Sequence, residues 1–338
     1  MAQSLPPWER KPPVRRGRPA AVPPQGLLRK PPVAKPPERA AQKPAPAPER
    51  APETPPSPRA SAAPAKRFPG YFYSRRYEAV ELIGEGGWGP VYKARDKVLG
   101  MVVAVKFLPE HMLLSKEAVR AFKQEARMAM ALSHENIVRL HNLEVERGRV
   151  FLVMEYVEGE TLRQVVQRVG RLTLDSVLSI AKPCCAALEY AHKMGVLHRD
   201  LKPDNLMVNR ESELRIIDFG TARAIHIHLG TVQEDFVEGT PGYMSPEMIR
   251  GAPVDVRTDV FSLGATLAEL LTGTRLFPAV VDPRRLGELQ AAPLAGVPEA
   301  VSAVILQSVA LDPAQRLPSA RALWEALALA AHRPAAGA

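Results

Sequence analysis

Hydrophobic residues change their spacing along this chain in a way that predicts strands in some stretches and helices in others. Apolar and polar residues alternate at 77–95, on both sides of a glycine-rich turn, as expected for two paired strands. A short apolar run at 102–108 predicts a buried strand. The stretch "RVFLVMEYVEGETL", residues 149–162, predicts another buried strand that continues into a linker.

Two other stretches show the periodicity of a helix. Residues from Lys116 to about Leu132 contain neither glycine nor proline and suit an amphipathic helix. Thr173 is placed to cap a long helix that extends to about Met194. Pro183 lies inside that helix and is expected to bend or interrupt it.

The first 68 residues differ from the rest in composition. They hold 19 of the 34 prolines, with 14 basic and 4 acidic residues, a net charge of +10, so the remaining residues are close to neutral and the basicity of the chain belongs to this segment. Few large apolar residues occur there, which predicts a disordered tail with polyproline II character. Pro52, Pro55 and Pro58 have the spacing of a ligand for a polyproline-recognising partner, although an inert spacer would have it too. Nucleic-acid binding is disfavoured because no aromatic residues lie among the basic ones.

The cysteines and the apolar runs exclude several classes of protein. Cys184 and Cys185 are adjacent, so a disulfide framework is excluded and a reducing compartment is expected. No cluster of Cys and His has zinc spacing. No apolar run approaches the roughly 20 residues of a membrane span, and the N-terminus lacks a signal-peptide core. These features predict a soluble, cytoplasmic protein.

Candidate chemistry is concentrated in Val196–Gly220, "VLHRDLKPDNLMVNRESELRIIDFG". Lys202 and Asn205 follow Asp200 closely, and Asp218 comes eighteen residues after Asp200. A solvated surface loop before a buried strand would give a similar composition. Upstream, Lys106 interrupts an apolar strand, where an unpaired charge is costly and a partner is therefore expected.

In combination, these motifs resemble protein kinases, specifically the serine/threonine kinases widespread in bacteria. The resemblance rests on the glycine turn "GEGGWG", on Lys106, on "FKQEARMAMALSHENIVRL" with Glu125, on the stretch 196–220 and on "GTPGYMSPE". It implies an α+β, two-lobed fold, with a five-stranded antiparallel sheet and one helix in the N-lobe and a mainly helical C-lobe. The domains expected are a basic Pro-rich tail at 1–68 and a kinase domain at 69–334. The N-lobe would cover about 77–155 and the C-lobe about 158–334.

The resemblance also implies an enzyme, a serine/threonine protein kinase in signal transduction that uses ATP and Mg²⁺. Asp200 would accept or orient the proton of the substrate hydroxyl, and Lys202 would stabilise the transferring phosphoryl group. Asn205 and Asp218 would hold Mg²⁺. Lys106 would contact the ATP phosphates and form an ion pair with a helical glutamate, Glu125. The implied ATP-binding residues are Ile83, Gly84, Gly86, Gly89, Val91, Ala104, Lys106, Glu125, Met154, Glu155, Val157 and Met207.

The segment between Asp218 and Glu247 would carry the regulation. Arg199 is expected to receive a phosphate there, and Thr231 is the only hydroxyl residue at 223–239, which makes it a candidate for autophosphorylation. Acidic residues that could supply the charge instead are Glu234, Asp235 and Glu238.

Three structural roles are implied further along the chain. Thr240 would contact the catalytic residues, Asp259 would cap the backbone of the catalytic loop, and Glu247 would form a buried ion pair with Arg316.

Two other functions stay open at this stage. One is a pseudokinase-type scaffold that presents the Pro-rich tail. Such proteins usually lack a catalytic residue that is present here. The other is a small-molecule phosphotransferase of the same fold, which would lack a segment such as "GTPGYMSPE". The sequence does not identify the protein substrate, the upstream signal, the oligomeric state or the role of the tail.

Overall fold

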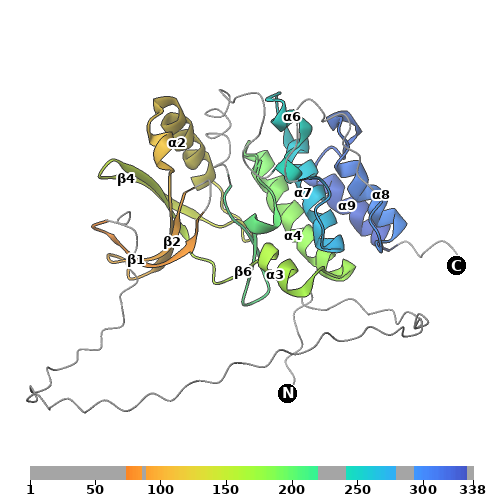
Figure 1. Cartoon of the computed structure of the whole chain (residues 1–338), viewed down its shortest axis with the longest axis horizontal. Helices are drawn as coiled ribbons and strands as arrows, with labels where there is room; N and C mark the ends of the chain where they lie inside the picture. The colour runs from red at the N-terminus through yellow and green to blue at the C-terminus, as the bar shows by residue number, and fades with distance from the viewer. Residues whose placement is uncertain (1–73, 86–88, 220–240, 279–292, 333–338) are drawn as a thin grey trace, which may run out of the picture. The chain divides into compact units, whose positions relative to one another are not determined.

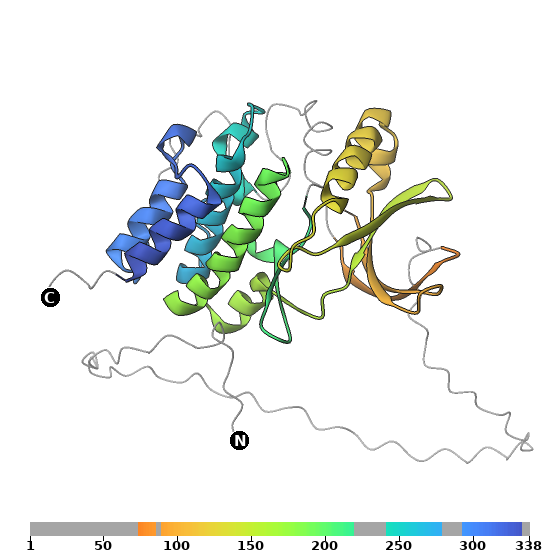
Figure 2. The same cartoon turned by 180° about the vertical axis from the view of Figure 1, so that it is seen from behind.

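The computed structural model describes residues 74–85, 89–219, 241–278 and 293–332. The predicted tail at 1–68, together with Gly86, Thr231 and Thr240, lies outside these residues. Figures 1 and 2 show the described part as two lobes, a sheet with α2 and a group of helices.

The first lobe contains the predicted five-stranded antiparallel sheet, in the order β1-β2-β3-β5-β4. Its strands are β1 Tyr77–Gly84, β2 Val91–Asp96, β3 Val102–Phe107, β4 Leu140–Glu146 and β5 Arg149–Glu155. β3 and β5 are central and almost fully buried, as their apolar runs predicted. In β3, Lys106 lies opposite Val91 of β2 and Leu152 of β5.

Side chains on the two faces of the sheet belong to separate clusters. Val105 and Phe107 pack with Phe151 on one face, while Ala104 and Leu152 share a cluster with α2 on the other. The two-residue period of a strand places Lys106 on the α2 side with Ala104. The helices here are α1 Glu110–Leu113 and α2 Lys116–Met130.

The C-lobe is organised around one helix that is buried on nearly every side, α7 Val256–Thr272. The surrounding helices are α3 Leu162–Val169, α4 Leu174–Lys193, α6 Pro246–Ile249, α8 Glu299–Ser308 and α9 Ala320–Ala331, with short 3₁₀ turns at Pro203–Asn205, Pro241–Tyr243 and Pro313–Gln315. A small sheet, β6 Gly159–Thr161, β7 Leu206–Asn209 and β8 Leu214–Ile216, lies beside them. None of the described helices is long and apolar enough to cross a membrane.

The prediction for α4 is confirmed at its N-terminus, and of the two effects expected at Pro183, a bend or an interruption, the interruption does not occur. The hydroxyl of Thr173 accepts a hydrogen bond from the backbone N–H of Ser176 (3.2 Å), which is an N-cap. The helix nevertheless continues through Pro183 without interruption. Its buried face, which includes Leu188, packs into the core and compensates for the missing backbone donor.

The lobes also meet through backbone hydrogen bonds. The N–H of Val138 donates to the carbonyl of Ile216 (2.9 Å), and the N–H of Ile216 donates to that of Asn136 (2.7 Å). The end of β8, which leads to Asp218, is therefore attached to the segment between α2 and β4.

Candidate active site

Three polar residues of the loop before β7 are locked together by hydrogen bonds. Lys202 Nζ lies 3.0 Å from Asp200 Oδ1 and 2.8 Å from Oδ2. The amide nitrogen of Asn205 donates to Asp200 Oδ2 (2.8 Å) and to the Asp200 carbonyl (2.7 Å). Lys202 and Asn205 are buried, so this arrangement is held in a partly water-excluded site.

Asp259 anchors the backbone of this loop by hydrogen bonds, as predicted. It is fully buried on α7 and accepts hydrogen bonds from the backbone N–H groups of His198 (2.8 Å) and Arg199 (2.7 Å). His192 Nε2 lies 2.8 Å from the same carboxylate. Burial alone would raise the pKa of Asp259, but the bond with His192 and the other nearby donors lower it. The left-handed backbone of Arg199 (φ 66°) is held by these bonds.

His198 connects the loop with the segment that carries Asp218. Its Nδ1 accepts a bond from the backbone N–H of Asp200 (3.2 Å), so Nε2 carries the proton and donates to the carbonyl of Ile217 (2.9 Å). Its ring packs edge-on against Phe219 at 4.6 Å between centroids. Burial lowers the pKa of His198, which keeps the ring neutral.

The buried Lys106 is paired with Asp218, at 2.8 Å between Nζ and Oδ2. Burial would raise the pKa of Asp218, but the charge of Lys106 outweighs it and lowers the pKa. The predicted Lys106–Glu125 ion pair is therefore wrong for this structure. Glu125 is buried on α2 and instead accepts a bond from Arg199 (3.1 Å). Asp218 pairs with Lys106 and Glu125 pairs with Arg199, and both ion pairs join the two lobes.

These groups face one cavity of about 430 Å³. It is lined by Gly84, Glu85, Gly89, Val91, Lys106, Lys202, Asp204, Asn205, Asp218 and Arg275. Gly89 has φ 84°, and a Cβ there would lie 2.2 Å from the carbonyl oxygen of Phe107, so the turn requires glycine. The predicted phosphate-facing and metal-binding groups are thus brought together, with Asp200 bonded to two of the lining residues.

Several other predicted ATP-binding residues do not line this large cavity. Ala104 and Met154 are buried in one cluster, against which Val91 and Tyr156 pack. Met154 also lines a small separate cavity with Asp218 and Phe219. Ile83 is 44% exposed on β1, and Met207 is half-buried on β7.

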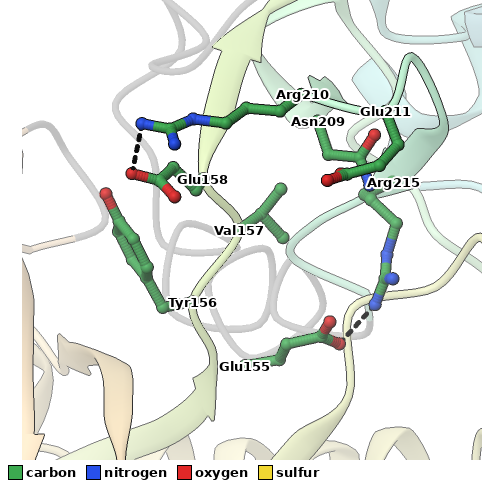
Figure 3. Close-up of a pocket in the computed structure, with 8 residues that line it drawn as sticks. All are labelled: Glu155, Tyr156, Val157, Glu158, Asn209, Arg210, Glu211 and Arg215. Atoms are coloured by element: carbon green, nitrogen blue, oxygen red, sulfur yellow. Dashed lines mark hydrogen bonds and ion pairs between the residues drawn. The ribbon is translucent and has the colours of Figure 1, made fainter.

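Glu155 and Val157, two further predicted ATP-binding residues, line a second cavity of about 130 Å³ (Figure 3). Two ion pairs border it: Arg215 with Glu155, and Arg210 with Glu158 (2.8 Å). These arginines come from the β7–β8 hairpin, so the linker between the lobes is tied to that hairpin.

The donor set in the large cavity fits a hard divalent cation. Asn205 uses its amide nitrogen for Asp200, which leaves its carbonyl oxygen as a ligand atom, and Asp218 supplies a carboxylate. Oxygen ligands of this kind suit Mg²⁺, which commonly combines one or two protein groups with phosphate oxygens and water. Among the described residues no cluster of three or more His, Cys, Asp or Glu side chains has the arrangement of a metal site.

One cluster beside the cavity was missed by the sequence reasoning. Arg163 of α3 bonds to Asp204 (3.2 Å), to the Tyr243 hydroxyl (2.6 Å) and to Glu269, and Tyr243 also donates to Glu269. Burial raises the pKa of Tyr243 to about 12, so its hydroxyl stays protonated. Asp204 and Tyr243 stand inside recognised motifs, but nothing in the sequence marks Arg163 or Glu269 as their partners.

Comparison with known proteins agrees with this geometry. Residues 77–324 match the family described as protein kinase domain. A probable serine/threonine-protein kinase of Clostridium perfringens is 35% identical over 259 residues, which cover 75% of this chain and 38% of that protein. Serine/threonine-protein kinase PknB of Mycobacterium tuberculosis is 38% identical over 259 residues, covering 73% of this chain and 41% of that one. This chain thus spans about two fifths of the length of these curated relatives. The crystal structure of the Mycobacterium tuberculosis PknI kinase domain is 27% identical, with a TM-score of 0.63, and the match covers 77% of this chain and 97% of that one.

Proposed function

The chain belongs to the protein kinase domain family, and we propose that it is an active ATP- and Mg²⁺-dependent serine/threonine protein kinase. The observation that carries the proposal is the hydrogen-bonded set of Asp200, Lys202 and Asn205 beside a cavity that Lys106 and Asp218 also line. The resemblance to serine/threonine kinases favours Ser and Thr hydroxyls of proteins as acceptors.

Each residue would contribute a positioning or electrostatic step. In the transfer, the acceptor oxygen forms a bond to the γ-phosphorus of ATP while the bond to the β,γ-bridging oxygen breaks, and ADP leaves. Asp200 would orient the hydroxyl and take its proton. Lys202, bonded to Asp200, would balance the charge of the transferring group. Lys106 would hold the other phosphates.

Asn205 and Asp218 are the residues that would hold the metal. When bound, Mg²⁺ would neutralise charge on the phosphates. Lys106 and Asp218 form an ion pair with each other in this structure, and the phosphate and the metal that they would hold would replace that contact.

The test is transfer of labelled γ-phosphate from ATP to the protein itself and to a generic protein substrate. Asp200→Asn removes the proton acceptor while keeping the size of the side chain, and the expected loss of rate is roughly 10²–10⁴-fold. ATP affinity should be unchanged, because Asp200 does not line the cavity.

The alternative is a scaffold that binds nucleotide and presents the tail. Wild-type protein that binds ATP with Mg²⁺ but transfers no label, with or without residues 1–68, would favour the scaffold. Transfer of labelled phosphate by Asp200→Asn at the wild-type rate would show that Asp200 does not have the proposed role.

We also propose autophosphorylation at Thr231, followed by binding of the phosphate to Arg199. Arg199 is paired with Glu125 in this structure, so a phosphate would compete with that carboxylate. Mass spectrometry of the active protein tests this: full activity with unmodified Thr231 would contradict it. A cytoplasmic location and a polyproline-recognising partner for the tail remain predictions, to be tested by cell fractionation and by pull-down with residues 1–68.

A further inference from the structure

One cation of the active-site cavity has no place in the reaction described above. Arg275 lines the cavity together with Lys202 and Asp204, although it comes from the segment after α7. Its side chain is exposed, and its guanidinium carbon lies 5.8 Å from the centroid of the Tyr243 ring.

The backbone around Arg275 is anchored on both sides. Gly273 ends α7 with φ 78°, and a Cβ there would lie 2.4 Å from the carbonyl of Gly170. Phe277 is buried and stacks on Phe261 at 5.5 Å between ring centroids. The position of Arg275 beside the cavity therefore follows from fixed packing on either side of it.

Two acids beside this part of the cavity are already matched with another cation. Asp204 and Glu269 both pair with Arg163, and Glu269 also accepts the Tyr243 hydroxyl. Within the part of the chain that the structure describes, no carboxylate lies within 4.0 Å of a nitrogen of Arg275. The rim thus presents a guanidinium whose charge is not neutralised by any of the described residues.

We propose that Arg275 selects acidic protein substrates, by binding the carboxylate of an Asp or Glu close to the acceptor hydroxyl. This inference rests on the proposed function. A guanidinium forms two parallel hydrogen bonds with a carboxylate, so it discriminates an acidic side chain from its amide. The substrate class follows from one residue that no motif of the sequence marked.

The sequence that follows the candidate autophosphorylation site is acidic, as the proposal expects of a substrate. Thr231 lies outside the described residues, but Glu234, Asp235 and Glu238 follow it in the chain. A second copy of the chain would therefore offer Arg275 an acidic acceptor segment.

The experiment compares two peptides as substrates of the full-length protein. One has the sequence of residues 224–239, and its matched control carries Glu234→Gln, Asp235→Asn and Glu238→Gln. The wild type is expected to show a kcat/KM roughly tenfold higher for the acidic peptide, the effect of one charge-assisted hydrogen bond. R275A should bring the ratio of kcat/KM for the acidic peptide to that for the control peptide close to one. R275K should retain part of the preference, and R275E should favour the neutral peptide.

Two controls separate this role from others. R321A removes an exposed arginine of α9 that does not line the cavity, and it should leave the peptide ratio unchanged. The KM for ATP should be the same in R275A and the wild type. A KM for ATP that rises in R275A with the peptide ratio unchanged would assign Arg275 to the nucleotide and overturn the inference.

The remaining outcomes are also decisive. Equal kcat/KM of the wild type for both peptides, or transfer to a generic protein but to neither peptide, overturns the selection of acidic substrates while the proposed function stands. No transfer to any acceptor contradicts the proposed function, and the inference fails with it.

Discussion

Several buried side chains around the catalytic loop have specific partners, and burial together with those partners shifts the pKa values of His198, Asp218 and Asp259. His198 is the residue where this has a measurable consequence. It is fully buried, and its two ring nitrogens bond to Asp200 N–H and the Ile217 carbonyl in the neutral form only. Burial outweighs the nearby carboxylates of Asp259 and Asp200 and lowers the pKa.

The consequence is a loss of stability in mild acid. Below the ordinary histidine pKa of about 6.5, the unfolded chain takes up a proton at position 198 that the folded chain does not. The contribution of His198 is therefore complete above that pH and is lost as the pH falls. The free energy of unfolding should drop by at most about 1.4 kcal/mol per pH unit from this residue.

Denaturant unfolding of the wild type and His198→Gln at pH 5 to 7.5 measures this effect. Glutamine keeps a donor and an acceptor but does not titrate, so its stability should depend less on pH. Identical pH slopes for the two proteins would show that His198 does not contribute.

At the scale of elements, α6 is attached to the end of the C-lobe by one buried ion pair. Arg316 follows the turn at Pro313–Gln315 and bonds to Glu247 at 2.7 and 2.8 Å, as predicted. Burial would raise the pKa of Glu247, but Arg316 and Thr258 lower it. The guanidinium also donates hydrogen bonds to the backbone carbonyls of Ala310 and Arg257, so it connects α6 with α7 and with the loop after α8.

Arg316→Ala should lower the free energy of unfolding by about 3–5 kcal/mol, because it leaves the Glu247 carboxylate buried without its counter-charge. Thermal or denaturant unfolding measures the loss. Arg321→Ala is the matched control, since it removes an exposed ion pair with Glu325 on α9 and should change stability little. Similar losses in both variants would contradict the special importance of the buried pair.

At the scale of the whole molecule, the two lobes are joined across the site by Lys106–Asp218 and Glu125–Arg199. The first pair uses two groups that the proposed reaction requires for phosphate and metal. In the proposed reaction, nucleotide binding would therefore rearrange this contact between the lobes, and Asp218 would link the affinity for ATP to the presence of Mg²⁺.

Asp218→Asn should remove most of the enhancement of ATP affinity by Mg²⁺. Changes outside the direct ligands already cost about 10–100-fold in metal affinity, so loss of a carboxylate ligand should cost at least about tenfold. ATP affinity in EDTA should be unchanged or higher, because Lys106 is no longer neutralised. Calorimetry with a non-hydrolysable ATP analogue measures both affinities.

Lys106→Met is the control for this prediction. It should weaken ATP binding both with Mg²⁺ and in EDTA, since it removes the cation that is proposed to hold the phosphates. Full Mg²⁺ enhancement in Asp218→Asn would exclude Asp218 as a metal ligand.

Much of the fold and of the site was predictable because its signals are local. The apolar residues around Lys106 indicate a strand, and Thr173 indicates the start of a helix. Asp200, Lys202 and Asn205 are close neighbours in the sequence. Hydrophobic period and short-range hydrogen bonding act over a few residues, so they can be read without knowing the rest of the molecule.

The sequence by itself determined which chemical groups are present and on which elements they stand. The tertiary structure alone decided which carboxylate neutralises Lys106. It also decided that Arg163 bonds to Asp204, Tyr243 and Glu269, and that Arg275 lines the cavity. Several opposite charges were available to each cation in the sequence. Coulomb energy falls with distance and depends on burial, so the choice among them is made by the packing of segments that are far apart in the chain.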